Sequence, residues 1–213
     1  FREALEIGQR SGVPVHVTHL SQRITSTGGG RRLLRLVEDA SEGGQDVTFD
    51  TVPIYPGSTR LIIMFPDWAH DGGPERLKEV LRSQEHRQRL RDEVQPTGSW
   101  QDMWLTYFKR PENQVYEGCS ISEMAIMRDQ HPVDAMCELL LEEDLQTSFN
   151  TMSTNLNTLP AFITHPLSMV GSDALLLGDF PPPRTYGTFP SILADYVREE
   201  NQMSLPTGIR KIT

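Results

Sequence analysis

Two side chains that could bind a metal and move a proton occur at the ends of predicted β-strands. His19 ends the alternating, β-branched stretch VPVHVTH, and Asp173 ends the apolar stretch LSMVGSD. In parallel α/β folds, ligands bind beyond the carboxyl ends of the strands. Zinc accepts imidazole and carboxylate ligands, and zinc-assisted hydrolysis needs a nearby base to accept a proton from water. His19 is therefore a candidate metal ligand, and Asp173 is a candidate general base.

Other motifs give weaker signals for chemistry. His16 lies three residues before His19, and residues three apart on a regular strand point to opposite faces, so we interpret His16 as structural. The stretch STGGGRR (26–32) lacks the Lys-Ser/Thr ending of a phosphate-binding loop, and no G-x-S-x-G nucleophile elbow occurs. A proline-rich stretch after Asp173 leads to Arg184, a cation that could act together with that carboxylate.

The elements that would position these residues alternate between helix and strand at both ends of the chain. A helical pattern near 2–10 precedes the first strand, and another near 31–44 separates it from the stretch QDVTFDTVPIY (45–55). Strand, helix and strand with short links predict a parallel sheet. The strand that ends at Asp173 is followed by an amphipathic pattern at 189–201 and a short helical pattern from Ser204.

The middle of the chain breaks this alternation. Residues 60–150 are rich in charge and read as short helices, with no good strand pattern. We therefore expect an α/β fold in three parts: βα units at 1–59, a helical insertion at 60–150, and the last strand and C-terminal helices at 151–213.

Composition excludes some partners. The 213 residues carry a formal net charge of −9, which argues against nucleic acid or an anionic membrane as a main partner. No apolar run is long enough to span a bilayer. Cys119 and Cys137 have no zinc-ligand spacing, and they favour reduced thiols in a cytoplasmic protein. The chain opens within an apparent helix and without Met, so we expect it to be a fragment of a longer protein.

Five stretches, in order, resemble one known family. They are EALEIGQRSGVPVHVTHL (3–20), DVTFDTVPIYPGST (46–59), FPDWAHDGG (65–73), MVGSDAL (169–175) and PPRTYGTFPSILADYVREE (182–200). The family is that of the N-acyl-D-amino-acid deacylases, or D-aminoacylases, of the amidohydrolase superfamily. The resemblance implies a metal-dependent hydrolase that cleaves N-acyl (D-)amino acids, with one or two Zn²⁺ ions in the complete enzyme. It also implies that this chain is part of a (β/α)8 TIM-like barrel, about strands six to eight.

The resemblance assigns roles to individual residues. His19 matches the histidine that ends the sixth strand and binds metal, and Asp173 matches the general acid/base at the end of the eighth. Arg184 matches an arginine in the following loop that pairs with the substrate's carboxylate. Residues 60–150 match a lid-like insertion. The other metal ligands would lie upstream, so the fragment should be inactive alone and should need the remainder of its barrel as a partner.

The chain also departs from the family. Ser21 replaces a lysine and Val52 replaces a tyrosine, both of which help bind substrate in the family. Tyr55 and Thr59 are close enough in the sequence to compensate, and we take Thr59 as a further substrate-binding candidate. Two alternatives stay open: a cyclic amidase of the hydantoinase or dihydropyrimidinase kind, and a non-catalytic amidohydrolase homologue. Arg184 and the lid favour a linear substrate that carries a carboxylate.

Overall fold

The structure of the protein, a computed structural model, describes residues 1–26, 29–96, 98–176 and 178–213. Part of the STGGGRR stretch lies outside these residues. The chain divides into two compact units. The first comprises Phe1–Tyr55, Ser153–Ala174 and Pro183–Thr213, and the second comprises Pro56–Met152 and Leu175–Pro182.

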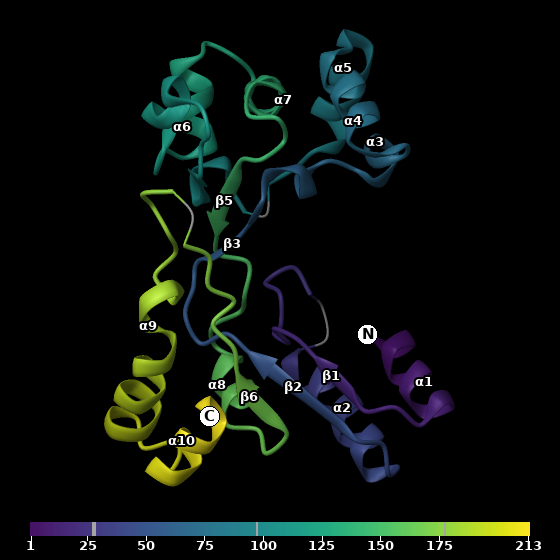
Figure 1. Ribbon diagram of the computed structural model, residues 1–213, viewed down its shortest axis with the longest axis vertical. Helices are drawn as coiled ribbons and strands as arrows, with labels where there is room; N and C mark the ends of the chain where they lie inside the picture. Colours follow the sequence, from purple (N-terminus) through teal and green to yellow (C-terminus); the bar gives the residue numbers. More distant parts are fainter. Residues whose placement is uncertain (27–28, 97, 177) are drawn as a thin grey trace. The chain divides into compact units, whose positions relative to one another are not determined.

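The first unit contains a parallel sheet of three strands (Figure 1). Its strands are β1 (Val15–Val17), β2 (Val47–Thr51) and β6 (Ser168–Val170), in the order β1-β2-β6. Val15 pairs with Val47, and Phe49 pairs with Ser168. The expectation that these three strands are parallel neighbours is confirmed.

The strands alternate between a covered face and an uncovered face. Val47, Phe49 and Thr51 are buried, whereas Thr48 and Asp50 between them are partly exposed. The ring of Phe49 packs edge-to-face on Phe162, with ring centroids 6.4 Å apart. On the neighbouring strands, His16 and Met169 are exposed. The covered face is therefore the apolar core of this unit, and the uncovered face is largely polar.

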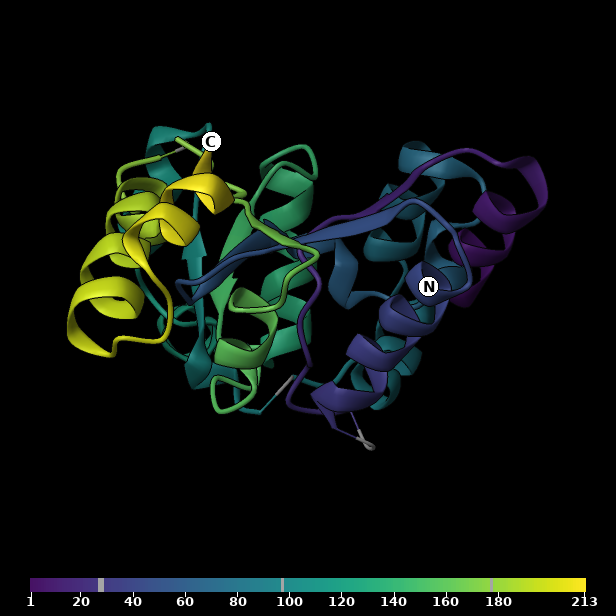
Figure 2. The ribbon, with the colours of Figure 1, turned by 90° about the horizontal axis from the view of Figure 1, so that it is seen from below.

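Helices pack against this sheet, and further helices follow its last strand in the chain. They are α1 (Arg2–Ser11), α2 (Gly30–Glu42), α8 (Leu159–Ile163), α9 (Arg184–Ser191), the π-helix η4 (Ile192–Glu199) and α10 (Leu205–Ile212). The predicted amphipathic helix at 189–201 is thus α9 followed by a π-helical stretch. Pro190 lies inside α9 and has no backbone N–H to donate, and the change of helix type follows directly after it. In both views α10 packs beside the helix formed by α9 and η4 (Figures 1 and 2).

The second unit contains an antiparallel sheet, and here the prediction was wrong. Residues 60–150 were expected to hold no strand, yet β4 (Met103–Thr106) and most of β5 (Ser148–Thr151) lie within them. Together with β3 (Gly57–Arg60) they form a sheet in the order β3-β5-β4. Each strand has only four residues. The segments GSTR and SFNT are mostly polar, and all four residues of SFNT are buried, so neither shows the apolar–polar alternation that identifies a strand.

Short helices make up most of the rest of the second unit, as expected. They are η1 (Leu61–Met64), α3 (Asp67–His70), α4 (Gly73–Arg82), α5 (Gln84–Glu93), η2 (Trp100–Asp102), η3 (Pro111–Tyr116), α6 (Ile121–Met127) and α7 (Pro132–Glu142). Their apolar residues form one core that includes Leu81, Leu90, Met124 and Leu139. This unit therefore has a hydrophobic core of its own. Within the described residues, no helix is long and apolar enough to cross a bilayer.

Candidate metal and substrate site

His19 lies in the turn that follows β1, two residues beyond the end of the strand. Its φ is 41°, in the left-handed region that costs an ordinary residue roughly 1–2 kcal/mol. The backbone N–H of His19 donates to Oδ1 of Asp50 at 2.7 Å. The imidazole is exposed, and it makes no hydrogen bond or ion pair among the described residues. The turn therefore presents a ring that can act as a ligand.

His16 differs from His19 in that both of its ring nitrogens are engaged. Nδ1 lies 2.8 Å from Oγ1 of Thr48, and Nε2 lies 3.0 Å from Oδ2 of Asp50. Both partners belong to the neighbouring strand β2. These contacts agree with the interpretation of His16 as a structural residue.

Asp173 lies three residues beyond β6, again at a left-handed φ, here 44°. Its side chain is 48% exposed, and its Oδ2 lies 2.7 Å from Nη2 of Arg184. The Arg184 side chain is only 4% exposed. The two candidates that the sequence separates by a proline-rich stretch thus form an ion pair with one half-exposed and one buried partner.

The expectation that Arg184 lies on a loop was wrong, because it is the first residue of α9. Pro183 precedes it as the N-cap residue with φ −53°, and the fixed φ of proline suits the start of a helix. Arg184 is therefore held by a helix as well as by its ion pair.

The chain between Asp173 and Arg184 belongs largely to the second unit. Oε1 of Glu117 accepts hydrogen bonds from the backbone N–H groups of Asp179, at 2.8 Å, and Phe180, at 3.3 Å. Gly178 has φ 70°, and a Cβ at this position would lie 2.2 Å from the same oxygen, so only glycine fits there. Glu117 thus anchors the connection between the two candidates.

The residues expected near the substrate are divided between the units. Thr59 lies in β3 of the second unit, where it pairs with Phe149, whereas His19, Asp173 and Arg184 belong to the first unit. Tyr55 packs against the cluster that contains Ile163 and Ile192.

The two positions that depart from the family also have defined surroundings. Ser21 lies with its Oγ 3.4 Å from Oγ1 of Thr154, and Val52 is buried. Neither supplies the amine or phenol that the resemblance predicts at these positions.

Comparisons with known proteins identify relatives of this chain. No family model matches it. It is 26% identical over 212 residues to the N-acyl-D-glutamate deacylase of Alcaligenes xylosoxydans xylosoxydans, and 28% identical over 216 residues to the D-aminoacylase of the same organism. These alignments cover 99% and 100% of this chain and 36% of each relative.

Solved structures agree with these relatives. The N-acyl-D-glutamate deacylase of Bordetella bronchiseptica, solved with zinc and a phosphonate mimic of the tetrahedral intermediate, superposes with a TM-score of 0.73 at 25% identity. A D-aminoacylase studied for its binuclear metal centre superposes with a TM-score of 0.71 at 25% identity. Each match covers 100% of this chain and 37% of the solved chain. The chain is a homologue of part of the D-aminoacylases. It spans little more than a third of their length.

The donor atoms of this D-aminoacylase homologue fit zinc in type but are too few to hold it alone. His19 and Asp173 offer imidazole and carboxylate, and each follows a strand that pairs with β2. Within the described residues, however, no group of three or more His, Cys, Asp and Glu side chains could hold a metal ion. Burial raises the pKa of the Cys137 thiol to about 12 and also raises the pKa of Cys119, so neither is readily available as a thiolate.

One residue of the site was missed by the sequence analysis. Asp50 binds both the backbone of His19 and the ring of His16, and its side chain is only 19% exposed. A signal existed in the sequence, because Asp50 is the one acidic residue inside the β-branched and aromatic segment VTFDTV. An acidic side chain within such a strand needs a partner.

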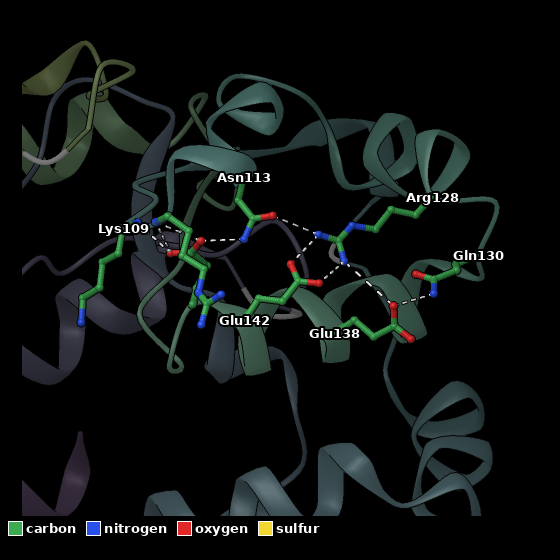
Figure 3. A network of polar contacts seen from close by, with 8 residues as sticks. Lys109, Asn113, Arg128, Gln130, Glu138 and Glu142 are labelled. Carbon is green, nitrogen blue, oxygen red and sulfur yellow. Dashed lines mark hydrogen bonds and ion pairs between the residues drawn. The ribbon is translucent and has the colours of Figure 1, made fainter.

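A second group of charged residues forms a network of polar contacts in the second unit (Figure 3). Several of these residues line a hollow of about 540 Å³. Glu142 binds Arg128 through both oxygens, at 3.0 and 2.7 Å, and Asn113 accepts a further bond from Arg128 at 3.3 Å. A hydrogen bond from Gln130 lowers the pKa of Glu138. Most of these groups contact one another, although Nε of Arg128 and Oε1 of Gln130 are buried without a hydrogen-bond partner among the described residues, and we interpret the cluster as a structural network.

A buried carboxylate completes this network. Glu143 is 1% exposed and accepts hydrogen bonds from the backbone of Lys109, at 2.6 Å, and from Nδ2 of Asn113, at 2.6 Å. It therefore ties the chain around Lys109 to the end of α7.

Proposed function

We propose that this chain belongs to a zinc-dependent amidohydrolase that cleaves the amide bond of N-acyl (D-)amino acids. The observation that carries the proposal is the ion pair between Asp173 and Arg184 at the carboxyl end of β6. It joins an exposed carboxylate, suited to proton transfer, to a buried guanidinium, suited to binding a carboxylate. The named activities of the homologues support the same reaction.

His19 would contribute a ligand to the metal site, with the carboxylate of Asp173 beside it as the base, and further ligands would come from residues outside this chain. Zinc, when bound, acts as a Lewis acid that polarises a carbonyl group and makes an attacking water more acidic. The free imidazole of His19 has the donor chemistry for such a ligand, and the exposed carboxylate of Asp173 can accept a proton from the water.

Asp173 would take a proton from the attacking water and return it to the leaving amine nitrogen. Arg184 would bind the α-carboxylate of the substrate. Because Arg184 contacts Asp173 directly, a carboxylate bound by the guanidinium would lie close to the base. This arrangement would place the scissile amide of an N-acyl amino acid within reach of Asp173.

The remaining assignments follow from the same proposal. The three parallel strands would be about strands six to eight of a TIM-like barrel, with the remainder of that barrel as their partner. Residues 60–150 would form the lid over the substrate. Thr59, just before this segment, would bind the substrate through its hydroxyl. The free thiols Cys119 and Cys137 favour a cytoplasmic location.

One specific observation favours a second candidate, a non-catalytic homologue. Buried Val52 and the small hydroxyl of Ser21 stand at positions where the family binds substrate with larger polar groups. Loss of these groups would weaken substrate binding without changing His19, Asp173 or Arg184.

The test is a hydrolysis assay on the full-length protein that contains this chain, purified with zinc. The panel comprises N-acetyl-D-methionine, N-acetyl-D-glutamate, their L-enantiomers and hydantoin, and the assay measures release of the free amine or opening of the ring. We expect hydrolysis of at least one N-acetyl amino acid. Opening of hydantoin alone would indicate the cyclic amidase, and zinc binding without any turnover would indicate the non-catalytic homologue.

A further inference from the structure

Asp50 lies at the centre of a chain of hydrogen bonds that crosses from β2 to the turn after β1. Thr48 contacts His16, His16 contacts Asp50, and Asp50 accepts from the backbone N–H of His19. The two strands are adjacent in the sheet (Figure 1). The chain of contacts thus begins on the uncovered face of the sheet and ends at the candidate metal ligand.

The turn that presents His19 is bound to Asp50 through two successive backbone groups. The N–H of His19 donates to Oδ1 of Asp50 at 2.7 Å, and the N–H of Leu20 donates to the backbone carbonyl of Asp50, also at 2.7 Å. The register between β1 and β2 runs only as far as Val17 and Phe49. Beyond that point the carboxylate takes over the function of the sheet hydrogen bonds and holds His19 at its left-handed φ.

The neighbouring strand on the other side leaves room for this carboxylate. A Cβ on Gly171 would lie 2.9 Å from Oδ1 of Asp50 and 3.2 Å from its Cγ. Gly171 follows β6 directly and precedes Asp173 by two residues. The glycine of the VGSD segment therefore makes space for Asp50, which lies between the strand ends that carry His19 and Asp173.

We propose that Asp50 is a positioning residue that fixes the turn on which His19 is presented to the metal. This inference rests on the proposed function, in which His19 is a metal ligand. Both carboxylate oxygens of Asp50 are already engaged, Oδ1 by the His19 N–H and Oδ2 by His16. Asp50 therefore acts on the metal through His19 rather than as a ligand.

The test compares D50L with D50N in the full-length protein. Leucine and asparagine are close in size to aspartate, but only asparagine keeps an oxygen that can accept from the His19 N–H. Zinc affinity is measured by competition with a chelator, and the visible spectrum of the cobalt-substituted protein reports the ligand geometry. We expect D50L to lose about 10- to 100-fold in affinity, the range typical of residues that orient metal ligands, and D50N to restore most of that loss.

A second measurement uses only the wild-type protein, so it does not depend on whether a variant folds. Hydrogen–deuterium exchange of the wild-type protein is read on fragments that contain His19 and Leu20. The His19 amide should exchange slowly although His19 is exposed, because it donates to the Asp50 carboxylate; the amide of buried Leu20, which donates to the backbone carbonyl of Asp50, serves as the reference. Exchange at the rate of an unstructured chain would overturn the proposal, and so would a D50L protein that binds zinc within about threefold of wild type with an unchanged cobalt spectrum.

These outcomes separate the two proposals. Wild-type protein that binds no zinc would count against the proposed metal site, and the exchange measurement would still decide whether Asp50 holds the turn. If wild-type protein binds zinc and D50L binds it equally tightly, the proposed metal site is supported and the positioning role of Asp50 is refuted.

Discussion

Replacing Arg184 by methionine should reduce kcat/KM far more for substrates with an α-carboxylate than for matched N-acyl amines. Methionine keeps much of the aliphatic volume of a side chain that is only 4% exposed, and it removes the guanidinium. A hydrogen bond between charged groups contributes about 1.5–3 kcal/mol. At about 1.4 kcal/mol for each factor of ten, the loss should be roughly 10- to 150-fold, and it should be confined to substrates that carry the carboxylate.

The ion pair adds a smaller effect that both substrate classes share. Removal of the guanidinium also deprives Asp173 of a partner 2.7 Å away. Because the Asp173 side chain is 48% exposed, water screens this pair, and its loss should change the rate by at most about fivefold, corresponding to about 1 kcal/mol. The decisive quantity is therefore the ratio of the two losses and not either loss alone.

The assay uses N-acetyl-D-methionine and N-acetyl-3-(methylthio)propylamine, which differ only in the carboxylate. Zinc content and thermal unfolding are measured for each protein, so that loss of fold or metal is seen separately. R184K serves as a matched variant, because lysine keeps the charge but cannot bind a carboxylate in the bidentate manner of arginine. Equal losses for both substrates would refute the reasoning and would make Arg184 a structural partner of Asp173.

Three further predictions concern the site and the cores. Asp173→Asn should lower kcat by roughly 100- to 10,000-fold while zinc content stays largely unchanged, because other ligands remain; loss of zinc in proportion to activity would contradict the role as a base. Burial raises the pKa of the Cys137 thiol from 9.0 to about 12, so the thiol ionises at lower pH in the unfolded chain than in the folded one. The free energy of unfolding should therefore fall between these two pH values, by at most roughly 4 kcal/mol. C137A should lack this slope in urea unfolding at alkaline pH. Glu143→Gln places an amide N–H₂ against the N–H groups that donate to the carboxylate, and should lower the free energy of unfolding in urea by about 1.5–3 kcal/mol. The control Glu75→Gln, on the exposed surface, should change it by no more than about 0.5 kcal/mol.

The sequence predicted the parallel sheet because its strands follow a local rule. The alternation of Val13, Val15 and Val17 and the β-branched segment around Phe49 identify strands without knowledge of their neighbours. The places of His19 and Asp173 follow from the strand ends. The antiparallel sheet could not be predicted in this way, since GSTR and SFNT become strands through their pairing with each other and with β4.

The interactions within the site depend on contacts between distant parts of the chain. Asp50 meets His16 and His19 across 34 and 31 positions of sequence, so no local pattern could reveal these contacts. The ion pair between Asp173 and Arg184 likewise depends on the helix start at Arg184, which the sequence-based analysis placed on a loop. Residue types were therefore predictable, and the partners that orient them were not.

The way the second unit is inserted has a consequence for the order of folding. β2 and β6 are hydrogen-bonded neighbours although Pro56–Met152 lies between them in the chain. Within that segment Gly57 pairs with Thr151, so its two ends are adjacent once the antiparallel sheet has formed. During synthesis on the ribosome, all three strands of this sheet emerge before β6 does. Pairing of Gly57 with Thr151 then shortens the loop that must close for β6 to pair with β2, and so lowers the conformational entropy that this closure costs.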